Sequence, residues 1–378
     1  MEKLLLIPGP SPVHPRILDA LAAPTVSHTS PELAADMSVA LENLKKIVFT
    51  KSGEPFVLAG AGTLSMEIAL LNVASKSDRI LVLSQGYFGD RMGQICQSFG
   101  LTYDLLQARW GRAILPQELE ARIKEKSYSV VVATHVDTGT GACAAVEDYA
   151  RILRGSGILF IVDGVCATGG IEERMDDWEI DVILTAAQKC FGAPPGLAIC
   201  VFSERAMAKR KSLASVPAYY SDILRWLPIM KDPPKYFSTH GVNEIRAFST
   251  ATKMMLEEGM EARFARHKKN ARAIRAALSA LGFGFFTEAP FLAETLTLAT
   301  YPSGVEDLAF RSALSQNGVI VAGGLGETAG KVFRMGHMGN LSLDQIFFAL
   351  AAMENALASL GYRFTKGAGT QTVRAELG

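Results

Sequence analysis

Three features of this chain carry groups that could do chemistry. The segment 60–63 (Gly-Ala-Gly-Thr) follows a short apolar run and opens a helical pattern, so its free backbone amides could bind a phosphate. Asp163 ends the apolar run 158–162, where an unpaired buried carboxylate is costly and a cationic nitrogen could pair with it. Lys189 precedes a turn rich in glycine and proline, and its amine could form a Schiff base with an aldehyde. A phosphate, a ring nitrogen and an aldehyde occur together in pyridoxal phosphate.

Each feature alone has an ordinary explanation. Glycine-rich turns mostly serve chain reversal, and a lysine near an apolar strand usually extends its amine to water. The order of the features is more informative, because each stands where an apolar, strand-like run gives way to a turn. Open α/β sheets bind ligands at this carboxyl end of their strands. We therefore expect one crevice to collect all three.

The composition favours small-molecule ligands over other classes of partner. The 38 basic and 38 acidic side chains cancel, which removes the main electrostatic reason to expect nucleic acid or an anionic membrane. Pro8-Gly9-Pro10 breaks the apolar start too early for a signal peptide, and no apolar stretch of transmembrane length follows. Five cysteines without metal-type spacing indicate a reduced, cytoplasmic protein with no metal site.

Apolar runs alternate with helical patterns through the first half of the chain. The runs that read as strands are 56–59, 79–84, 101–106, 129–134, 158–163, 182–185 and 197–202. Near-continuous apolar strands separated by helices predict an α/β fold with a mostly parallel sheet covered on both faces. Because 378 residues are too many for one core, we expect a second, smaller domain.

The second half of the chain has a different pattern. An irregular stretch, 212–241, is rich in aromatics and prolines, and a long helical segment, 243–281, leads to strand candidates at 296–300 and 332–335. From about residue 365 the chain is polar, and we expect it to be frayed. The predicted organisation is an N-terminal segment lining the active site (1–20), a large cofactor-binding domain (21–245) and a small α+β domain (246–378).

Motifs along the chain resemble those of one known family. They are Pro8-Gly9-Pro10-Ser11, Ser27-His28-Thr29-Ser30, residues 60–67, Val162-Asp163-Gly164-Val165, Gln188-Lys189, Ala193-Pro194-Pro195-Gly196 and Phe333-Arg334-Met335-Gly336. In combination they resemble the class V pyridoxal-phosphate aminotransferases of fold type I, in the branch of alanine:glyoxylate and serine:pyruvate aminotransferases. The resemblance runs from residue 4 to about residue 361.

The resemblance implies a cofactor role for each matching residue. Lys189 would form the Schiff base, and Asp163 would pair with the ring nitrogen. Phe88 and Val165 would pack on opposite faces of the ring. The residues that would contact the phosphate are Ala61, Gly62, Thr63 and Gln188, together with Tyr236 and Thr239 from the neighbouring subunit of a homodimer.

The resemblance also implies how substrate is bound. Arg334 would grip the substrate carboxylate through a bidentate guanidinium, and Gly9 would line the same pocket. No second basic residue clearly pairs with Arg334 to demand a dicarboxylate, so we expect small neutral amino acids.

Three places depart from the family's pattern. In segment 137–141 (Asp-Thr-Gly-Thr-Gly), Gly139 stands where the family often has a hydroxyl that contacts the cofactor, and Thr138 or Thr140 could replace it. Phe88 stands where close relatives often have tryptophan. His240 stands where the family has a proline-containing run, and we expect a surface histidine rather than a substrate-pocket residue.

The expected reaction is a ping-pong transamination from a small amino acid, with alanine or serine favoured, to glyoxylate or pyruvate. Other donors in the branch are pyridoxamine, ureidoglycine and aminophosphonates. A pyridoxal-phosphate lyase or cysteine desulfurase is an alternative, although the loop 321–331 contains no nucleophilic cysteine. A nucleotide-binding oxidoreductase is an alternative of another class, although Ser65 stands where its third glycine belongs. Intact Lys189 and Asp163 argue against an inactive binding protein.

Overall fold

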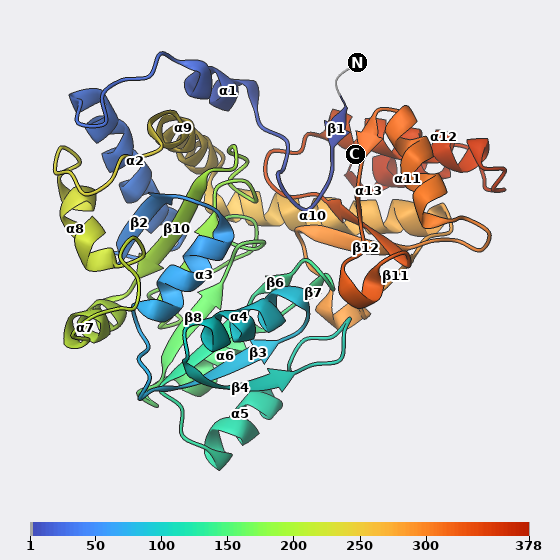
Figure 1. The fold of residues 1–378 in the computed structure, drawn as a ribbon. Helices are drawn as coiled ribbons and strands as arrows, with labels where there is room; N and C mark the ends of the chain where they lie inside the picture. Colours follow the sequence, from blue (N-terminus) through green and yellow to red (C-terminus); the bar gives the residue numbers. More distant parts are fainter. Residues whose placement is uncertain (1–2, 378) are drawn as a thin grey trace.

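The computed structural model describes residues 3–377, which form a large lobe and a small lobe (Figure 1). The large lobe is built on a seven-stranded sheet with the order β2-β10-β9-β8-β5-β3-β4. The pairs that β10 forms with β2 and β9 are antiparallel and the other four adjacent pairs are parallel, so the prediction of a mostly parallel sheet is confirmed. The strands are β2 (Glu54–Ala59), β3 (Arg79–Ser84), β4 (Thr102–Gln107), β5 (Val130–Thr134), β8 (Leu159–Asp163), β9 (Val182–Ala186) and β10 (Leu197–Phe202).

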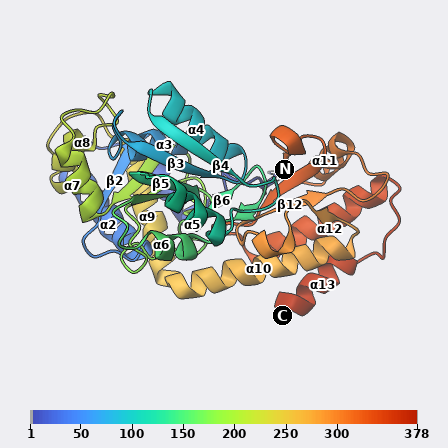
Figure 2. The same cartoon turned by 90° about the horizontal axis from the view of Figure 1, so that it is seen from below.

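Burial explains why the central strands read as continuous apolar runs. Every residue of β5, β8 and β9 is buried, whereas the edge strand β4 is only half-buried. Figure 2 shows α3 and α4 on one side of the sheet and α6 on the other. The helices of this lobe are α1 (Pro15–Ala22), α2 (Pro31–Ile47), α3 (Gly62–Leu71), α4 (Tyr87–Ser98), α5 (Pro116–Glu125), α6 (Val146–Leu153), α7 (Glu204–Ser212), α8 (Ile223–Lys231) and α9 (Val242–Glu258), and a short hairpin is formed by β6 (Val136–Asp137) and β7 (Ala142–Cys143).

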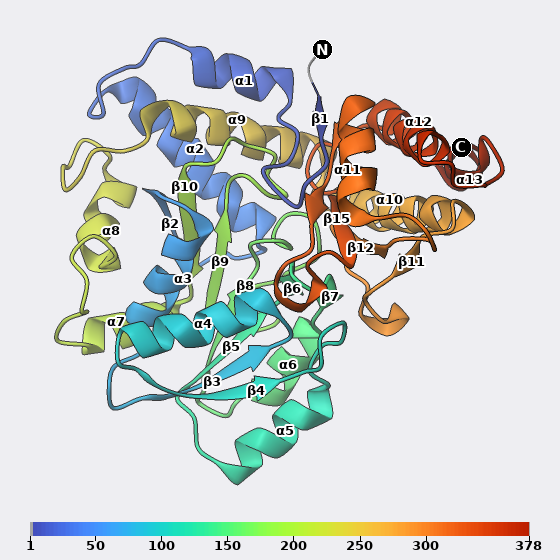
Figure 3. The same cartoon turned by 45° about the vertical axis from the view of Figure 1, so that its right-hand side comes forward.

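The small lobe packs helices on an antiparallel sheet with the order β11-β12-β15-β14. The start of the chain joins this lobe, because β1 pairs in parallel with β13 (Figure 3). Its elements are β1 (Leu4–Leu5), α10 (Met260–Ala280), β11 (Gly284–Phe285), β12 (Leu296–Thr300), α11 (Asp307–Gln316), β13 (Val319–Ile320), β14 (Ala322–Gly323), β15 (Val332–Gly336), α12 (Leu343–Ser359) and α13 (Ala368–Leu377), with short 3₁₀ turns at Ala289–Phe291 and Gly326–Thr328.

The predicted helical segment 243–281 is two helices, not one. Gly259 adopts a φ of +84°, which favours glycine, and it separates α9 from α10. The buried side chains of α9 belong to the core of the large lobe, whereas the second half of α10 packs in the core of the small lobe. Figure 2 shows α10 running beneath both lobes. The division predicted after residue 245 falls inside α9, and where the domains divide stays a prediction.

Two stretches are more regular than the sequence suggested. The prediction of a frayed end from residue 365 is wrong, because α13 packs on α10, buries Val373 and pairs Glu376 with Arg272 at 2.9 Å. The stretch 212–241 contains α8, which is capped by Asp222 and buries Trp226. Among residues 3–377, no helix is both long enough and apolar enough to cross a membrane.

Candidate active site

Asp163 lies at the carboxyl end of β8, the position that the sequence predicted for it. Its carboxylate is 2% exposed and accepts a single hydrogen bond within residues 3–377, from the Val165 amide at 3.0 Å. Burial raises the pKa of Asp163 to about 7, helped by the nearby Asp137 and Glu173, against the Val165 amide and the Lys189 amine, which lower it. The carboxylate therefore lacks the cationic partner that would keep it charged.

The Lys189 turn follows β9 and is held by the start of the chain. Ser11 donates from its hydroxyl to the Lys189 carbonyl at 2.7 Å and from its amide to the Gln188 carbonyl at 3.0 Å. The Lys189 Nζ donates to the Pro8 carbonyl. Gly9 has a φ of +93°, and a Cβ atom there would overlap the lysine side chain, so only glycine fits. The N-terminal segment thus lies against the amine.

A cavity of about 190 Å³ collects most of the predicted residues at this edge of the sheet. The predicted residues that line it are Ala61, Gly62, Thr63, Phe88, Thr138, Asp163, Val165, Gln188 and Lys189. The other lining residues are Met66, Arg91 and Val136, which the sequence did not single out, and Cys166, whose place near Asp163 in the sequence put it beside the expected site. A larger surface hollow of about 400 Å³ beside α6 is lined by paired surface charges and has neither a lysine nor a glycine-rich loop. We therefore assign the chemistry to the smaller cavity.

The amino end of α3 forms one wall of the cavity. The helix begins at Gly62 after Ala61, which has no side-chain cap, so its first amides are open to a ligand. Ser65 fixes the helix to the sheet, because its hydroxyl donates to the Thr185 carbonyl at 2.8 Å. The Gln188 amide oxygen is buried without a partner among the described residues. The open amides are donors and suit a phosphate, whereas the Gln188 amide oxygen is an acceptor that needs a donor from a ligand.

Phe88 is fixed by a buried carboxylate. Asp137 accepts from the Phe88 amide at 2.7 Å and from the Gly139 amide at 2.7 Å, which ties the start of α4 to the neighbouring turn. The Arg91 guanidinium lies 4.6 Å from the centre of the Phe88 ring and 3.4 Å from the Thr63 hydroxyl. Arg91 follows Phe88 by three residues on the same helix, and this spacing could have identified it from the sequence, because such residues share one helix face. Arg91 adds a second cation to the cavity.

The two candidate threonines, Thr138 and Thr140, lie in different surroundings. Thr138 lines the cavity, whereas the Thr140 hydroxyl is turned away and donates to the Gln85 carbonyl at 2.9 Å. Because the Thr140 hydroxyl already has this partner, Thr138 is the better candidate for contact with the cofactor.

Arg334 does not line the cavity directly. Its Nη1 lies 3.5 Å from the Thr138 carbonyl, and its Nε donates to the Gly323 carbonyl at 2.7 Å. No carboxylate among residues 3–377 forms an ion pair with it.

Tyr236 and Thr239 lie outside the cavity of their own chain. Tyr236 is 66% exposed, and its ring lies 5.2 Å from that of His28, centre to centre. Thr239 is also exposed. The expectation that His240 is a surface histidine is wrong, because it is buried 5.7 Å from the Trp226 ring and its burial lowers its pKa.

The cavity meets the requirements of pyridoxal phosphate. Asp163 lacks a cation, the open amides of α3 suit a phosphate, and Lys189 supplies an amine at the same cavity. Phe88 and Val165 supply apolar surfaces for a flat ring.

Known proteins of the same kind share this architecture. The profile of the family described as "Aminotransferase class-V" matches residues 16–343. An uncharacterized aminotransferase of Methanocaldococcus jannaschii is 34% identical over 100% of this chain and 98% of its own length. Alanine–glyoxylate aminotransferase 1 of Saccharomyces cerevisiae is 33% identical over 89% of this chain and 91% of its own. The crystal structure of ureidoglycine-glyoxylate aminotransferase from Bacillus subtilis has a TM-score of 0.94 at 26% identity, covering 100% of this chain and 98% of that one.

Proposed function

The chain belongs to the class V family of pyridoxal-phosphate-dependent aminotransferases, and from that premise we propose that it moves an amino group from alanine or serine to glyoxylate or pyruvate. The observation that carries the proposal is the joint presence of Lys189, Asp163 and the open amino end of α3 at one cavity. An aldehyde-bearing, phosphorylated pyridine complements all three groups.

Each residue has a role that follows from its chemistry. Bound pyridoxal phosphate supplies an aldehyde and an electron-withdrawing ring. Asp163, which accepts only the Val165 amide among the described residues, would hold a proton on the ring nitrogen through a charge-assisted hydrogen bond. Lys189 would hold the cofactor through its Nζ, and as a free amine it would act as the base that takes and returns the α-proton of the substrate.

The phosphate and the ring are held by neighbouring groups. We assign the phosphate to the amides of Gly62 and Thr63, with the Gln188 amide and the Arg91 guanidinium beside them. Phe88 and Val165 would pack on the two faces of the ring, and Thr138, in the turn after β6, lines the same cavity.

Substrate recognition falls to Arg334. Its guanidinium has no carboxylate partner among residues 3–377 and reaches the Thr138 carbonyl at the edge of the cavity. A bidentate pair with the α-carboxylate of an amino acid would satisfy the planar donors that remain free. Gly9 packs closely against the Lys189 side chain, and this tight approach favours a donor with a small side chain, such as alanine or serine.

We propose that the active unit is a homodimer. Exposed Tyr236 and Thr239 lie on a loop that does not reach the cavity of its own chain, and a second copy would bring them to the phosphate.

We also propose a cytoplasmic location, because all five cysteines are free thiols.

Lyase chemistry that depends on a nucleophilic cysteine has less support. Cys166 is the one cysteine that lines the cavity among the described residues, and burial raises the pKa of its thiol to about 11, so it remains protonated at neutral pH. The loop 321–331 supplies no other cysteine.

A product assay with single donors tests the proposal. The protein, loaded with pyridoxal phosphate, is mixed with glyoxylate and one donor at a time from alanine, serine, aspartate, pyridoxamine and ureidoglycine, and glycine is measured by chromatography. We expect alanine or serine to give the highest kcat/KM. The Lys189→Ala variant controls for uncatalysed transfer. A folded protein that forms no glycine above that control from any donor would contradict the proposal.

A further inference from the structure

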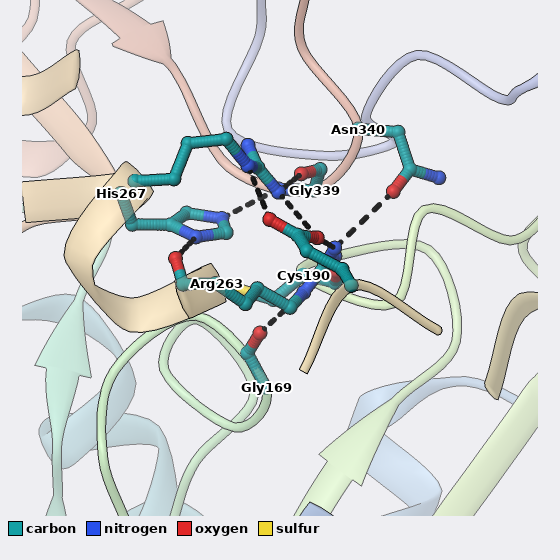
Figure 4. Close-up of polar contacts among 8 residues, drawn as sticks. Gly169, Cys190, Arg263, His267, Gly339 and Asn340 are labelled. Carbon is teal, nitrogen blue, oxygen red and sulfur yellow. Dashed lines mark hydrogen bonds and ion pairs between the residues drawn. The ribbon is translucent and has the colours of Figure 1, made fainter. Parts of the chain in front are cut away.

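Arg263 is a fully buried cation at the junction of the two lobes, outside the cavity. It lies near the start of α10, just after the break at Gly259, and is 1% exposed (Figure 4). Its guanidinium donates to acceptors from four separate segments. These are the Gly169 carbonyl at 2.8 Å, the Cys190 carbonyl at 2.6 Å, the Glu258 carboxylate at 2.7 Å and the Asn340 side-chain oxygen at 3.4 Å.

One of these acceptors belongs to the turn that carries the reactive amine. Cys190 directly follows Lys189, and its carbonyl is bound by Arg263. The carbonyl of Lys189 itself accepts from the Ser11 hydroxyl at 2.7 Å and from the Gly192 amide at 3.0 Å. Two successive carbonyls are thus fixed from two sides, one by the start of the chain and one by Arg263.

Only an arginine can make this set of contacts. Its planar fork points donors in fixed directions, whereas a lysine ammonium is a single point of charge on a flexible stem. Burying a cation is costly unless it is paired, and here a single carboxylate, Glu258, offsets that cost. A chain that only needed to join its two lobes could do so with apolar contacts.

We propose that Arg263 is a positioning residue for Lys189: through the Cys190 carbonyl it fixes the turn from which the Nζ projects into the cavity. This proposal rests on the proposed function, since it concerns the amine that binds pyridoxal phosphate. Arg263 touches neither cofactor nor substrate, so its effect reaches the chemistry only through the geometry of the turn.

Arg266 provides a matched control. It lies on the same helix, pairs with the same Glu258 carboxylate at 2.6 Å and donates to the Gly339 carbonyl at 3.0 Å. Among the described residues it makes no hydrogen bond to the Lys189 turn. A substitution of Arg266 therefore disturbs the same ion-pair cluster without releasing the Cys190 carbonyl.

The test compares Arg263→Lys with Arg266→Lys in the full chain loaded with pyridoxal phosphate. The first readout is the pH midpoint of the visible absorbance of the lysine-bound cofactor, which reports the surroundings of the Nζ atom. We expect Arg263→Lys to move that midpoint by about 0.5 pH unit or more. The second readout is steady-state kinetics, with kcat about 10- to 100-fold lower and KM within about threefold of the wild type. Arg266→Lys should resemble the wild type in both.

Two results would overturn the proposal. One is an Arg263→Lys protein with the wild-type midpoint and kcat. The other is an equal change in both variants, which would mean that the cluster only joins the lobes. If Arg263→Lys does not fold, Glu258→Gln is compared with Arg266→Lys, because the first variant loosens both arginines and the second loosens Arg266 alone. A midpoint that shifts in Glu258→Gln but not in Arg266→Lys supports the proposal, and a midpoint that is the same in both variants overturns it. A wild-type protein that gains no visible band fails at the proposed function, and this inference falls with it.

Discussion

The wall of the cavity around Lys189 differs from the loop around Tyr236 in how firmly it is held. Asp163 is 2% exposed, and the Lys189 turn is fixed by hydrogen bonds from Ser11 and Arg263. Tyr236 is 66% exposed, while its neighbour Phe237 packs 5.1 Å from the Trp226 ring, centre to centre. The groups expected to carry the chemistry are thus held in place within one chain, whereas the residues expected to complete the phosphate site lie on an exposed loop.

This difference teaches where substitutions should act. A change in the buried wall should reduce the rate of the chemical step, since the groups there are already in place. A change in the exposed loop should reduce the affinity for the cofactor and leave the chemistry intact.

The largest effect is expected from Asp163→Asn. The amide cannot hold a proton on the ring nitrogen as a carboxylate does, so we expect kcat to fall about 10³-fold. Steady-state kinetics at saturating pyridoxal phosphate would measure it. A loss below tenfold would mean that the buried wall does not supply the electron sink.

The same carboxylate should make the stability of the cofactor-free protein depend on pH. Its pKa is raised from 3.8 to about 7 by burial, so its contribution is fully favourable below about pH 4 and is lost as the pH rises to about 7. Relative to Asp163→Asn, the wild type should therefore lose up to about 4 kcal/mol of unfolding free energy across that window. Urea unfolding of both proteins at pH 4.5 and pH 8 measures it. A difference that is the same at both pH values would refute this prediction.

Arg334→Lys should have the next largest effect, and it should appear in KM. Loss of the bidentate fork weakens the hold on the substrate carboxylate, so we expect KM for the amino donor to rise about 10- to 100-fold. The affinity for pyridoxal phosphate, measured by fluorescence titration, should stay the same. A variant with unchanged KM would place the carboxylate elsewhere.

The smallest effect should come from Tyr236→Phe. One lost hydrogen bond to the phosphate should weaken cofactor affinity about 2- to 10-fold with little change in kcat at saturation. Sedimentation velocity of the wild type, run in parallel, should show a dimer. A monomeric wild type with full cofactor affinity would contradict this prediction, because the exposed loop around Tyr236 would then have no role at the cavity.

Strand positions were predictable because buried strands are continuous apolar runs bounded by turns. The bounds of β3, β10 and β12 match the predicted runs to the residue. Helix boundaries were less predictable. Helical spacing continues across Gly259, and only its positive φ divides α9 from α10. The helix α13 was missed because few of its side chains are buried, so its sequence reads as polar.

The site was predictable where local motifs carry it, as in the turn of Lys189 and the amino end of α3. Thr138 and Thr140 could not be separated, because only the fold shows that the Gln85 carbonyl uses one of the two hydroxyls. No sequence pattern predicted the buried position of Arg263 or its hydrogen bonds. Its partners come from segments far apart in the sequence, and one buried arginine in a helical pattern looks like any other surface cation.

The most direct measurement is the absorbance spectrum of the purified protein mixed with pyridoxal phosphate, compared with that of Lys189→Ala. We predict a band near about 410–430 nm in the wild type alone, which fades when alanine or serine is added and returns with glyoxylate. A wild-type spectrum identical to that of Lys189→Ala, with no response to any amino donor, would contradict the assignment of Lys189 as the residue that binds the cofactor.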